Sequence, residues 1–338
     1  MTTSERTRPS GNPRLPSGDR LDDAIATVSH ALESRLRPAL TGTCPGIEVD
    51  DLIPLLTGGK LLRSRLTILI AQALGTPQTA EIVRACVALE LVHTASLVHD
   101  DIIDDSVTRR GLPTVQRSTT PATAILLGDL LLSLAFEEVA PLGTEATAAL
   151  AHAFTQLCIG QLAESGLTWD AEAQPSIESY ARRKTGGLFG ASVELAALAA
   201  GLPAPQAGQL RASGELLGIA FQLADDLVDV QHDLSELDKD HGADLRNGIP
   251  TLPIWHAYHA LRAAGRGPEE LGWSERLGRE AGSPAARAFT LQRIAELADA
   301  ARDSLPDTAT PALVDSAVSI VLSALPEYAP RDPEGPVS

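Results

Sequence analysis

Cysteine is scarce in this chain, and long apolar runs are missing. Three cysteines, Cys44, Cys86 and Cys158, are too dispersed for a zinc site and odd in number for a disulfide framework. This usage indicates a reducing compartment. No apolar run reaches the roughly 18 residues of a membrane span. The N-terminus, MTTSERTRPSGNPRLPSGDR, has no apolar core of the signal-peptide kind. We therefore predict a cytoplasmic protein without a membrane span.

Positive charge is also in short supply. The formal net charge is −17 at pH 7, which disfavours a nucleic-acid partner held by general electrostatics. Of the 27 basic residues only three are lysines, which lie in TGGKLLRSR, RRKTGGLFG and LDKDHGADL as Lys60, Lys184 and Lys239. One such residue alone is more often an ordinary surface lysine. All three lie beside glycine-rich or aspartate-rich segments, which indicates a functional role.

The alternation typical of strands does not persist anywhere in the chain. Between about residues 20 and 325, alanine and leucine dominate and apolar residues recur three and four positions apart. Glycine and proline mark the breaks. We predict one all-α domain over 20–325, a helical bundle with room for a deep site between facing helices. A disordered leader is predicted at 1–19, and a proline-rich, disordered tail at 326–338.

Two pairs of aspartates lie at the ends of apolar helical segments, and within each pair the two aspartates are four residues apart. The segment HDDIIDD contains Asp100 and Asp104, and FQLADDLVD contains Asp225 and Asp229. Residues four apart share a helix face, so each pair presents two carboxylates in one direction. The ordinary interpretation is a pair of solvated helix ends. Aspartate at a helix C-terminus opposes the helix macrodipole, however, and here the same spacing occurs twice.

A divalent-cation site accounts best for these carboxylates. An EF-hand calcium loop is excluded because its alternating oxygen ligands and central glycine are missing. A glycosidase acid–base pair would not need four-residue doublets. Magnesium takes oxygen ligands and commonly bridges carboxylates to substrate phosphates. Basic residues suited to phosphate lie beside glycine pairs or follow the aspartate motifs. They are Lys60, Arg63, Arg109, Arg110, Lys184 and Lys239.

The ordered motifs resemble those of a known family, the head-to-tail trans-isoprenyl diphosphate synthases, or polyprenyl synthetases. In chain order they are GGKLLRS, ELVHTASLVHDDIIDDSVTRRG, KTGGLF, GIAFQLADDLVD and GADLRNGIPTLP. One DDxxD motif is a weak signal, whereas this series in this order is very specific. The resemblance implies the all-α isoprenoid-synthase fold with a deep central cavity, a homodimer, and a reaction that joins isopentenyl diphosphate to an allylic diphosphate.

The resemblance also implies roles for residues at matching positions. Asp100 and Asp104 would bind two magnesium ions, and Asp225, supported by Asp229, would bind a third. The other motif carboxylates would act more indirectly and are Asp101 and Asp226. The residues that would hold the allylic diphosphate are Lys184, Lys239 and Arg109. Those that would hold the diphosphate of isopentenyl diphosphate are Lys60, Arg63, His93 and Arg110. Thr185 and Gln222 would line the reacting region.

The implied reaction begins with loss of diphosphate from the allylic substrate, assisted by magnesium and lysine. The double bond of isopentenyl diphosphate then attacks the allylic cation, and the released diphosphate takes the proton. Two alternatives stay open. A class I terpene cyclase shares the fold and the ionisation step but needs no second diphosphate pocket. A non-catalytic partner subunit of another synthase can lose an aspartate motif, and both motifs are intact here.

Three positions depart from the family pattern. Leu61 and Ser64 stand where arginine and proline are common, and Ile249 stands where lysine is common, which removes one expected phosphate contact. Chain length is a separate expectation. Ala95 and Ser96, just before the first motif, are small, which favours geranylgeranyl diphosphate (C20) or a longer product. The alternative is that the cavity for the growing chain is closed deeper in the fold, by Leu131, Leu134 or Phe136.

Overall fold

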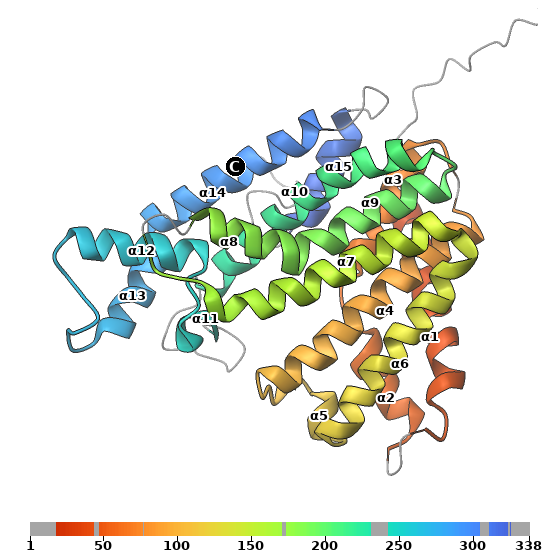
Figure 1. The fold of residues 1–338 in the computed structure, drawn as a ribbon, viewed down its shortest axis with the longest axis horizontal. Helices are drawn as coiled ribbons and strands as arrows, with labels where there is room; N and C mark the ends of the chain where they lie inside the picture. Colours follow the sequence, from red (N-terminus) through yellow and green to blue (C-terminus); the bar gives the residue numbers. More distant parts are fainter. Residues whose placement is uncertain are drawn as a thin grey trace, which may run out of the picture.

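The computed structural model describes residues 18–43, 47–76, 78–170, 174–230, 243–304, 311–323 and 325. The predicted tail and all but positions 18 and 19 of the predicted leader lie outside these residues, as does Lys239. Apart from one short hairpin and the connecting turns, the described part of the predicted domain is helical, which confirms the all-α fold (Figure 1).

The described helices divide into a main bundle and smaller elements. The bundle contains α1 (Gly18–Leu40), α2 (Val49–Thr57), α3 (Leu62–Ala73), α4 (Ala80–Ile103), α6 (Pro121–Val139), α7 (Thr144–Ala163), α8 (Gln174–Ala181), α9 (Gly187–Ala199), α10 (Ala204–Asp229), α14 (Pro284–Asp303) and α15 (Pro311–Val321). The smaller helices are α5 (Val115–Ser118), α11 (Ala243–Asn247), α12 (Leu252–Ala263) and α13 (Trp273–Ala281). Single turns occur as the 3₁₀ helices η1 (Ala140–Leu142) and η2 (Glu164–Gly166) and the π-helical segment η3 (Arg182–Gly186).

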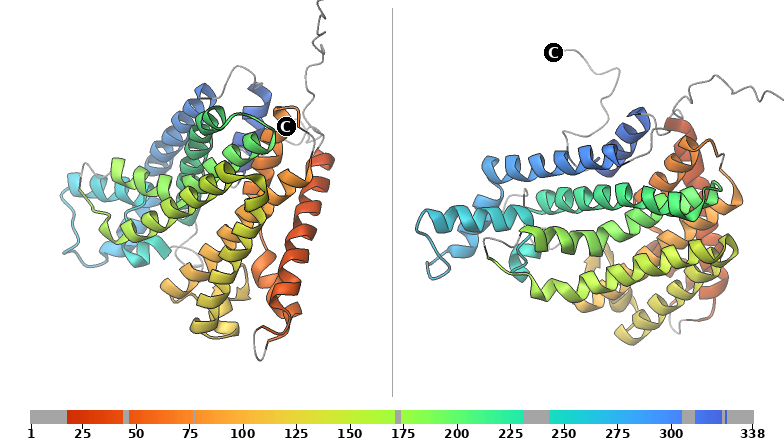
Figure 2. Two further views of the ribbon diagram at one scale, coloured as in Figure 1. Left: turned by 45° about the vertical axis from the view of Figure 1, so that its right-hand side comes forward. Right: turned by 45° about the horizontal axis from the view of Figure 1, so that its top comes forward.

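Two long helices, α4 and α10, organise the core and carry the aspartate motifs at their C-terminal ends. The α4 helix packs against α3, α6 and α9, and α10 packs against α9 and α14 (Figure 2). Glycine permits the closest approach of α10 to α9, because a Cβ atom on Gly214 would lie 2.5 Å from the carbonyl oxygen of Phe189. The packing therefore places both motifs on well-supported helices.

The α4 helix is also the one described helix that is long and apolar enough to cross a membrane by length and composition alone. It begins at an N-cap, Thr79, whose side chain accepts a hydrogen bond from the backbone N–H of Ile82. Inside the bundle, 67% of its most apolar stretch is buried. The apolar character of α4 is that of a core helix.

A short hairpin follows the first aspartate motif and is too small for a pattern of alternation to predict. Its strands are β1 (Thr108–Arg109) and β2 (Leu112–Pro113), paired antiparallel. The two turn residues, Arg110 and Gly111, have φ values of 54° and 76°. Positive φ at both positions is what a two-residue type I′ turn requires. The hairpin thus presents two consecutive arginines beside α4.

Candidate active site

The first aspartate pair lies at the C-terminus of α4. The helix ends at Ile103, but the backbone N–H of Asp104 still donates to the carbonyl oxygen of Asp100 at 2.8 Å, so the last turn is complete. Burial raises the pKa of Asp100 to about 6; Lys184 opposes this rise and Asp104 adds to it. Burial also raises the pKa of Asp104, with Lys184 again opposing the rise. Burial of the two carboxylates is therefore the main reason why their ionised forms are disfavoured in the metal-free protein.

The second pair, Asp225 and Asp229, ends α10. Burial raises the pKa of Asp225, and Asp229 raises it further, whereas Lys60 lowers it. Asp226, between them, is buried and accepts a hydrogen bond of 2.8 Å from Nε2 of Gln222. Burial is therefore also the main reason why the ionised form of Asp225 is disfavoured.

Two acidic residues that the sequence analysis did not assign also face these pairs. Asp244, in α11, has its pKa raised by burial and by Asp229, and it also interacts with Lys184 and with Glu164. Asp244 belongs to the GADL segment, so a sequence signal existed. Glu164 begins η2, and no motif marked it.

Glu164 and Lys184 form an ion pair that acts on the first aspartate pair and on Asp244. Nζ of Lys184 is 2.7 Å from Oε1 of Glu164 and 5.4 Å from the ring centroid of Tyr180, whose hydroxyl donates to the same carboxylate. Lys184 and Glu164 interact electrostatically with Asp100 as well as with Asp244. Asp244 also interacts with Asp229 and Asp225 of the second pair, so Lys184 and Glu164 connect the two regions electrostatically through Asp244.

The π-helical segment η3 carries Lys184 and Thr185. Interruptions of this kind are frequent at functional sites. The hydroxyl of Thr185 donates to Oε1 of Gln222, and Gln222 donates to Asp226. On the other side, a Cβ atom on Gly160 would lie 2.6 Å from the backbone nitrogen of Lys184, so only glycine lets α7 pack this closely. The structure thus links Thr185 and Gln222, as expected for two residues that line the same region.

A basic cavity of about 460 Å³ adjoins the second aspartate cluster. The residues predicted to hold the diphosphate of isopentenyl diphosphate all line it. They are Lys60, Arg63, His93 and Arg110, and Arg109 and Asp225 also line the cavity. Burial lowers the pKa of His93 well below its usual value, and Arg63 and Arg110 lower it further. A neutral imidazole can donate one hydrogen bond to an anion while adding no repulsion to the three arginines.

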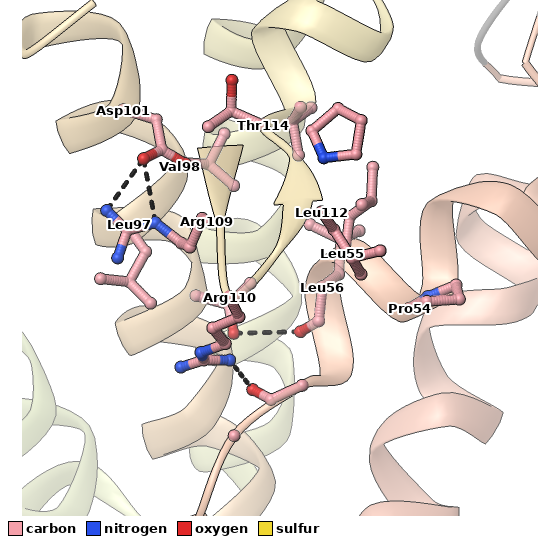
Figure 3. A pocket seen from close by; sticks show the side chains of 15 residues that line it. Pro54, Leu55, Leu56, Leu97, Val98, Asp101, Arg109, Arg110, Leu112 and Thr114 are labelled. Atoms are coloured by element: carbon pink, nitrogen blue, oxygen red, sulfur yellow. Dashed lines mark hydrogen bonds and ion pairs between the residues drawn. The ribbon is translucent and has the colours of Figure 1, made fainter. Parts of the chain in front are cut away.

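The two hairpin arginines are held differently (Figure 3). Arg109 forms two bonds to Oδ1 of the buried Asp101, at 2.9 Å from Nε and 2.8 Å from Nη2. Arg110 donates from Nη1 to the carbonyl oxygen of Gly58, and a Cβ atom on Gly59 would collide with its guanidinium. Asp101 therefore fixes the guanidinium of Arg109, and its role in the reaction stays a prediction.

The carboxylates fit a hard divalent cation whose coordination is completed by water and phosphate oxygens. All the donors are oxygens, and burial, which raises the pKa of Asp100 and of Asp225, disfavours the ionised carboxylates that a bound cation would stabilise. Within the described residues, no three His, Cys, Asp or Glu side chains are close enough together to hold a metal ion by themselves.

Replacement of Asp100 by asparagine is expected to stabilise the metal-free protein. The pKa of Asp100 is about 6 in the fold, against a reference value of 3.8. A carboxylate with a raised pKa costs stability progressively as pH rises from about 4 to about 6, and the full cost is present above that range. In EDTA at pH 8, Asp100→Asn should raise Tm by about 2 °C.

The same comparison near pH 4 should show a much smaller difference, because Asp100 is then protonated in the folded state and partly protonated in the unfolded state. The control is Asp23→Asn, at an exposed position in α1. An unchanged or lower Tm for Asp100→Asn at pH 8 would contradict the electrostatic description of this aspartate.

The residues expected to influence chain length lie within α4. Ala95 is fully buried, and Ser96 is 7% exposed and donates from Oγ to the carbonyl oxygen of His93 at 2.8 Å. The alternative floor residues on α6 are Leu131 and Leu134, both buried, and Phe136, which is partly buried against the core.

Comparison with known proteins gives a consistent result. The model of the family described as Polyprenyl synthetase matches residues 51–270. Nonaprenyl diphosphate synthase of Mycobacterium tuberculosis is 37% identical over 245 residues, which cover 71% of this chain and 70% of that protein. Heptaprenyl diphosphate synthase component 2 of Geobacillus stearothermophilus is 36% identical over 257 residues, which cover 74% of this chain and 78% of that protein.

A solved structure shows the same architecture. The polyprenyl synthase of Caulobacter crescentus, complexed with calcium and isoprenyl diphosphate, is similar with a TM-score of 0.74 and 28% identity. The match covers 94% of this chain and 99% of the other.

Proposed function

Because this chain belongs to the polyprenyl synthetase family, we propose that it joins isopentenyl diphosphate head to tail to an allylic diphosphate. The starter would be dimethylallyl, geranyl or farnesyl diphosphate, and the product an all-trans polyprenyl diphosphate. One observation carries the proposal. Lys184 interacts with Asp100 of the first carboxylate pair and with Asp244 near the second, and a basic cavity adjoins Asp225 of the second pair. The protein thus has binding chemistry for two diphosphates.

In the proposed reaction, Asp100, Asp104, Asp225 and Asp229 would hold three magnesium ions, which when bound stabilise negative charge on the departing diphosphate. Lys184 and Arg109 hold the allylic diphosphate, together with Lys239. Asp101 orients Arg109 through its two bonds. The buried walls exclude water from the allylic cation, and the released diphosphate takes the final proton.

The second substrate occupies the basic cavity. Lys60, Arg63 and Arg110 supply charge to its diphosphate, and neutral His93 supplies a hydrogen bond. This cavity favours the synthase over a terpene cyclase, which would have no use for a second diphosphate pocket. One relative is named as a synthase component, so a partner subunit is the other alternative. Both carboxylate clusters are present here, which favours a catalytic chain.

The test is incubation of the purified protein with isopentenyl diphosphate, magnesium and each of the three allylic starters, with products read by mass spectrometry. Stepwise addition of C5 units is the expected result. A cyclic hydrocarbon from an allylic diphosphate alone would favour the cyclase. Activity that appears only with a second protein would favour the partner subunit.

We further propose that the product is C20 or longer, with Ala95 and Ser96 leaving the path along α4 open. Ala95→Phe should shorten the main product by at least one C5 unit, because the ring fills space that the growing chain must enter. Mass spectrometry of the products, with Tm to show that the variant is folded, checks this. A folded variant with unchanged product length would place the floor elsewhere, at Leu131, Leu134 or Phe136.

A homodimer in the cytoplasm is the proposed state of the protein. Exposed apolar side chains on α6 and α7 offer a contact surface, and they include Leu126, 68% exposed, and Leu162, 80% exposed. Such exposure favours association between chains. Light scattering should give twice the chain mass of 35.5 kDa, and a monomer at micromolar concentration would contradict the proposal.

A further inference from the structure

The N-terminus of α3 has no cap of its own. Leu61, at the N-cap, has left-handed backbone angles, φ 47° and ψ 45°, and no side chain there accepts a hydrogen bond from the helix. The first N–H groups of a helix lack acceptors within the helix, so buried ones need partners from elsewhere. This turn carries Lys60 just before it and Arg63 within it. The placement of the helix end therefore decides where these two cations lie.

Glu90 of α4 supplies the missing acceptor. Its Oε1 accepts from the backbone nitrogen of Ser64 at 3.1 Å and from Oγ of Ser64 at 2.8 Å. Glu90 is only 4% exposed, and Ser64 is fully buried. A carboxylate at a helix N-terminus is favoured by the macrodipole, and hydrogen bonds to an ionised acceptor are stronger than neutral ones. Glu90 is thus a cap provided by a neighbouring helix.

The same carboxylate faces the buried Arg63. The guanidinium carbon of Arg63 lies 5.1 Å from the ring centroid of Phe189, and its Nε has no hydrogen-bond partner among the described residues. Burial lowers the pKa of Arg63 to about 10, Glu90 opposes this change, and Arg110 adds to it. Glu90 therefore offsets the repulsion between two arginines that line one cavity.

We propose that Glu90 and Ser64 are positioning residues for the isopentenyl diphosphate site. Glu90, fixed by two donors from Ser64, anchors the first turn of α3 and keeps Lys60 and Arg63 directed at the bound diphosphate. The inference rests on the proposed function, since it deepens the assignment of the basic cavity. Proline at position 64, common in the family that the sequence resembles, would offer neither donor. The anchor through Ser64 is therefore a property of this chain.

Three variants test the anchor in the full-length protein. Ser64→Ala removes the hydroxyl, Ser64→Pro removes both donors, and Glu90→Gln removes the charge. Proline is sterically acceptable because Ser64 lies in the first turn of α3. Calorimetry measures the dissociation constants of inorganic pyrophosphate and isopentenyl diphosphate, and steady-state kinetics measures KM and kcat.

The variants are expected to weaken binding of isopentenyl diphosphate and to leave use of the allylic substrate nearly unchanged. Ser64→Ala should weaken binding of isopentenyl diphosphate about threefold to tenfold, and Ser64→Pro and Glu90→Gln should weaken it further. The KM for the allylic substrate should change less than about twofold, as should kcat at saturation, because neither residue contacts that region.

Two matched controls lie outside the cavity. Ser192→Ala removes a buried hydroxyl that donates only within its own helix, to the carbonyl oxygen of Leu188 at 2.9 Å. Glu178→Gln breaks an ion pair of 2.8 Å with Arg293. Both should leave the affinity for isopentenyl diphosphate unchanged.

The outcomes separate the inference from the proposed function. If wild-type protein binds isopentenyl diphosphate and all three variants bind it equally well, the anchor is wrong and the proposed function stands. Equal losses for the allylic substrate and for isopentenyl diphosphate would show a general structural role and also overturn the anchor. If wild-type protein binds neither pyrophosphate nor isopentenyl diphosphate, the proposed function itself is wrong.

Discussion

Replacement of Asp100 or Asp225 by alanine is expected to lower kcat by about a thousandfold or more while the fold is retained. The carboxylates lie at the ends of two different helices, so each variant removes an oxygen donor from one cluster and leaves the other intact. Electrostatic stabilisation of a developing charge is commonly worth about 10²–10³ in rate for each donor. Loss of a metal ligand should cost at least as much.

The helical fold should survive these changes because both aspartates have raised pKa values and contribute no stabilising charge in the metal-free protein. Circular dichroism and Tm check the fold, and product formation at saturating magnesium checks the rate. Asp23→Ala, at an exposed position in α1, is the control. Turnover within tenfold of wild type in either active-site variant would sink the assignment of these carboxylates to metal binding.

The second large effect concerns two of the three lysines. Lys184→Ala should lower kcat/KM for the allylic substrate by about 10²–10³, because it removes a cation that acts on Asp100 and Asp244. Lys60→Ala should instead raise KM for isopentenyl diphosphate by about tenfold or more, the loss expected for one charged contact. Initial rates with each substrate varied in turn separate the two effects.

The ion pair between Lys184 and Glu164 complicates the first variant, since Lys184→Ala leaves Glu164 uncompensated beside Asp100. The double variant Lys184→Ala/Glu164→Gln removes that repulsion. If it recovers most of the lost activity, Lys184 acts mainly by neutralising Glu164 and does not hold the allylic diphosphate. Arg302→Ala, which breaks exposed ion pairs with Asp299 of α14 and Asp315 of α15, serves as the surface control.

The aspartate pairs could be located from the sequence because their geometry is local. A spacing of four within a helical pattern fixes two carboxylates on one face, whatever the rest of the fold does. The structure adds that α4 ends just before Asp104 while the hydrogen bond to Asp100 keeps the turn intact. The C-terminal position on two core helices is thus a prediction that the helix bounds confirm.

The basic cavity was not predictable from local patterns. Lys60, His93 and Arg110 come from three different elements, and no periodicity relates them. The resemblance grouped them, and the structure brings all of them to one cavity with Arg63. Their catalytic roles stay predictions until substrate binding is measured.

Three features of the site could not be predicted from the sequence: the position of Glu164, the environment of Asp244 and the hairpin. The position of Glu164 depends on how α7 meets η3, and a glutamate in ESG gives no sign of an ion pair 20 residues away. Asp244 lies in a recognised motif, but its pKa is raised by burial and by Asp229, which comes from another helix, and neither cause can be read from the motif. The hairpin is fixed by two positive φ values over four paired residues, too short for alternation to reveal.

The central claim is that one chain holds two diphosphate sites of different chemistry. Calorimetry with wild-type protein, isopentenyl diphosphate and a non-ionisable allylic thiodiphosphate tests it most directly. The account predicts that isopentenyl diphosphate binds with or without magnesium, that the allylic analogue needs magnesium, and that both bind together with one of each per chain. Mutually exclusive binding of the two ligands would contradict it.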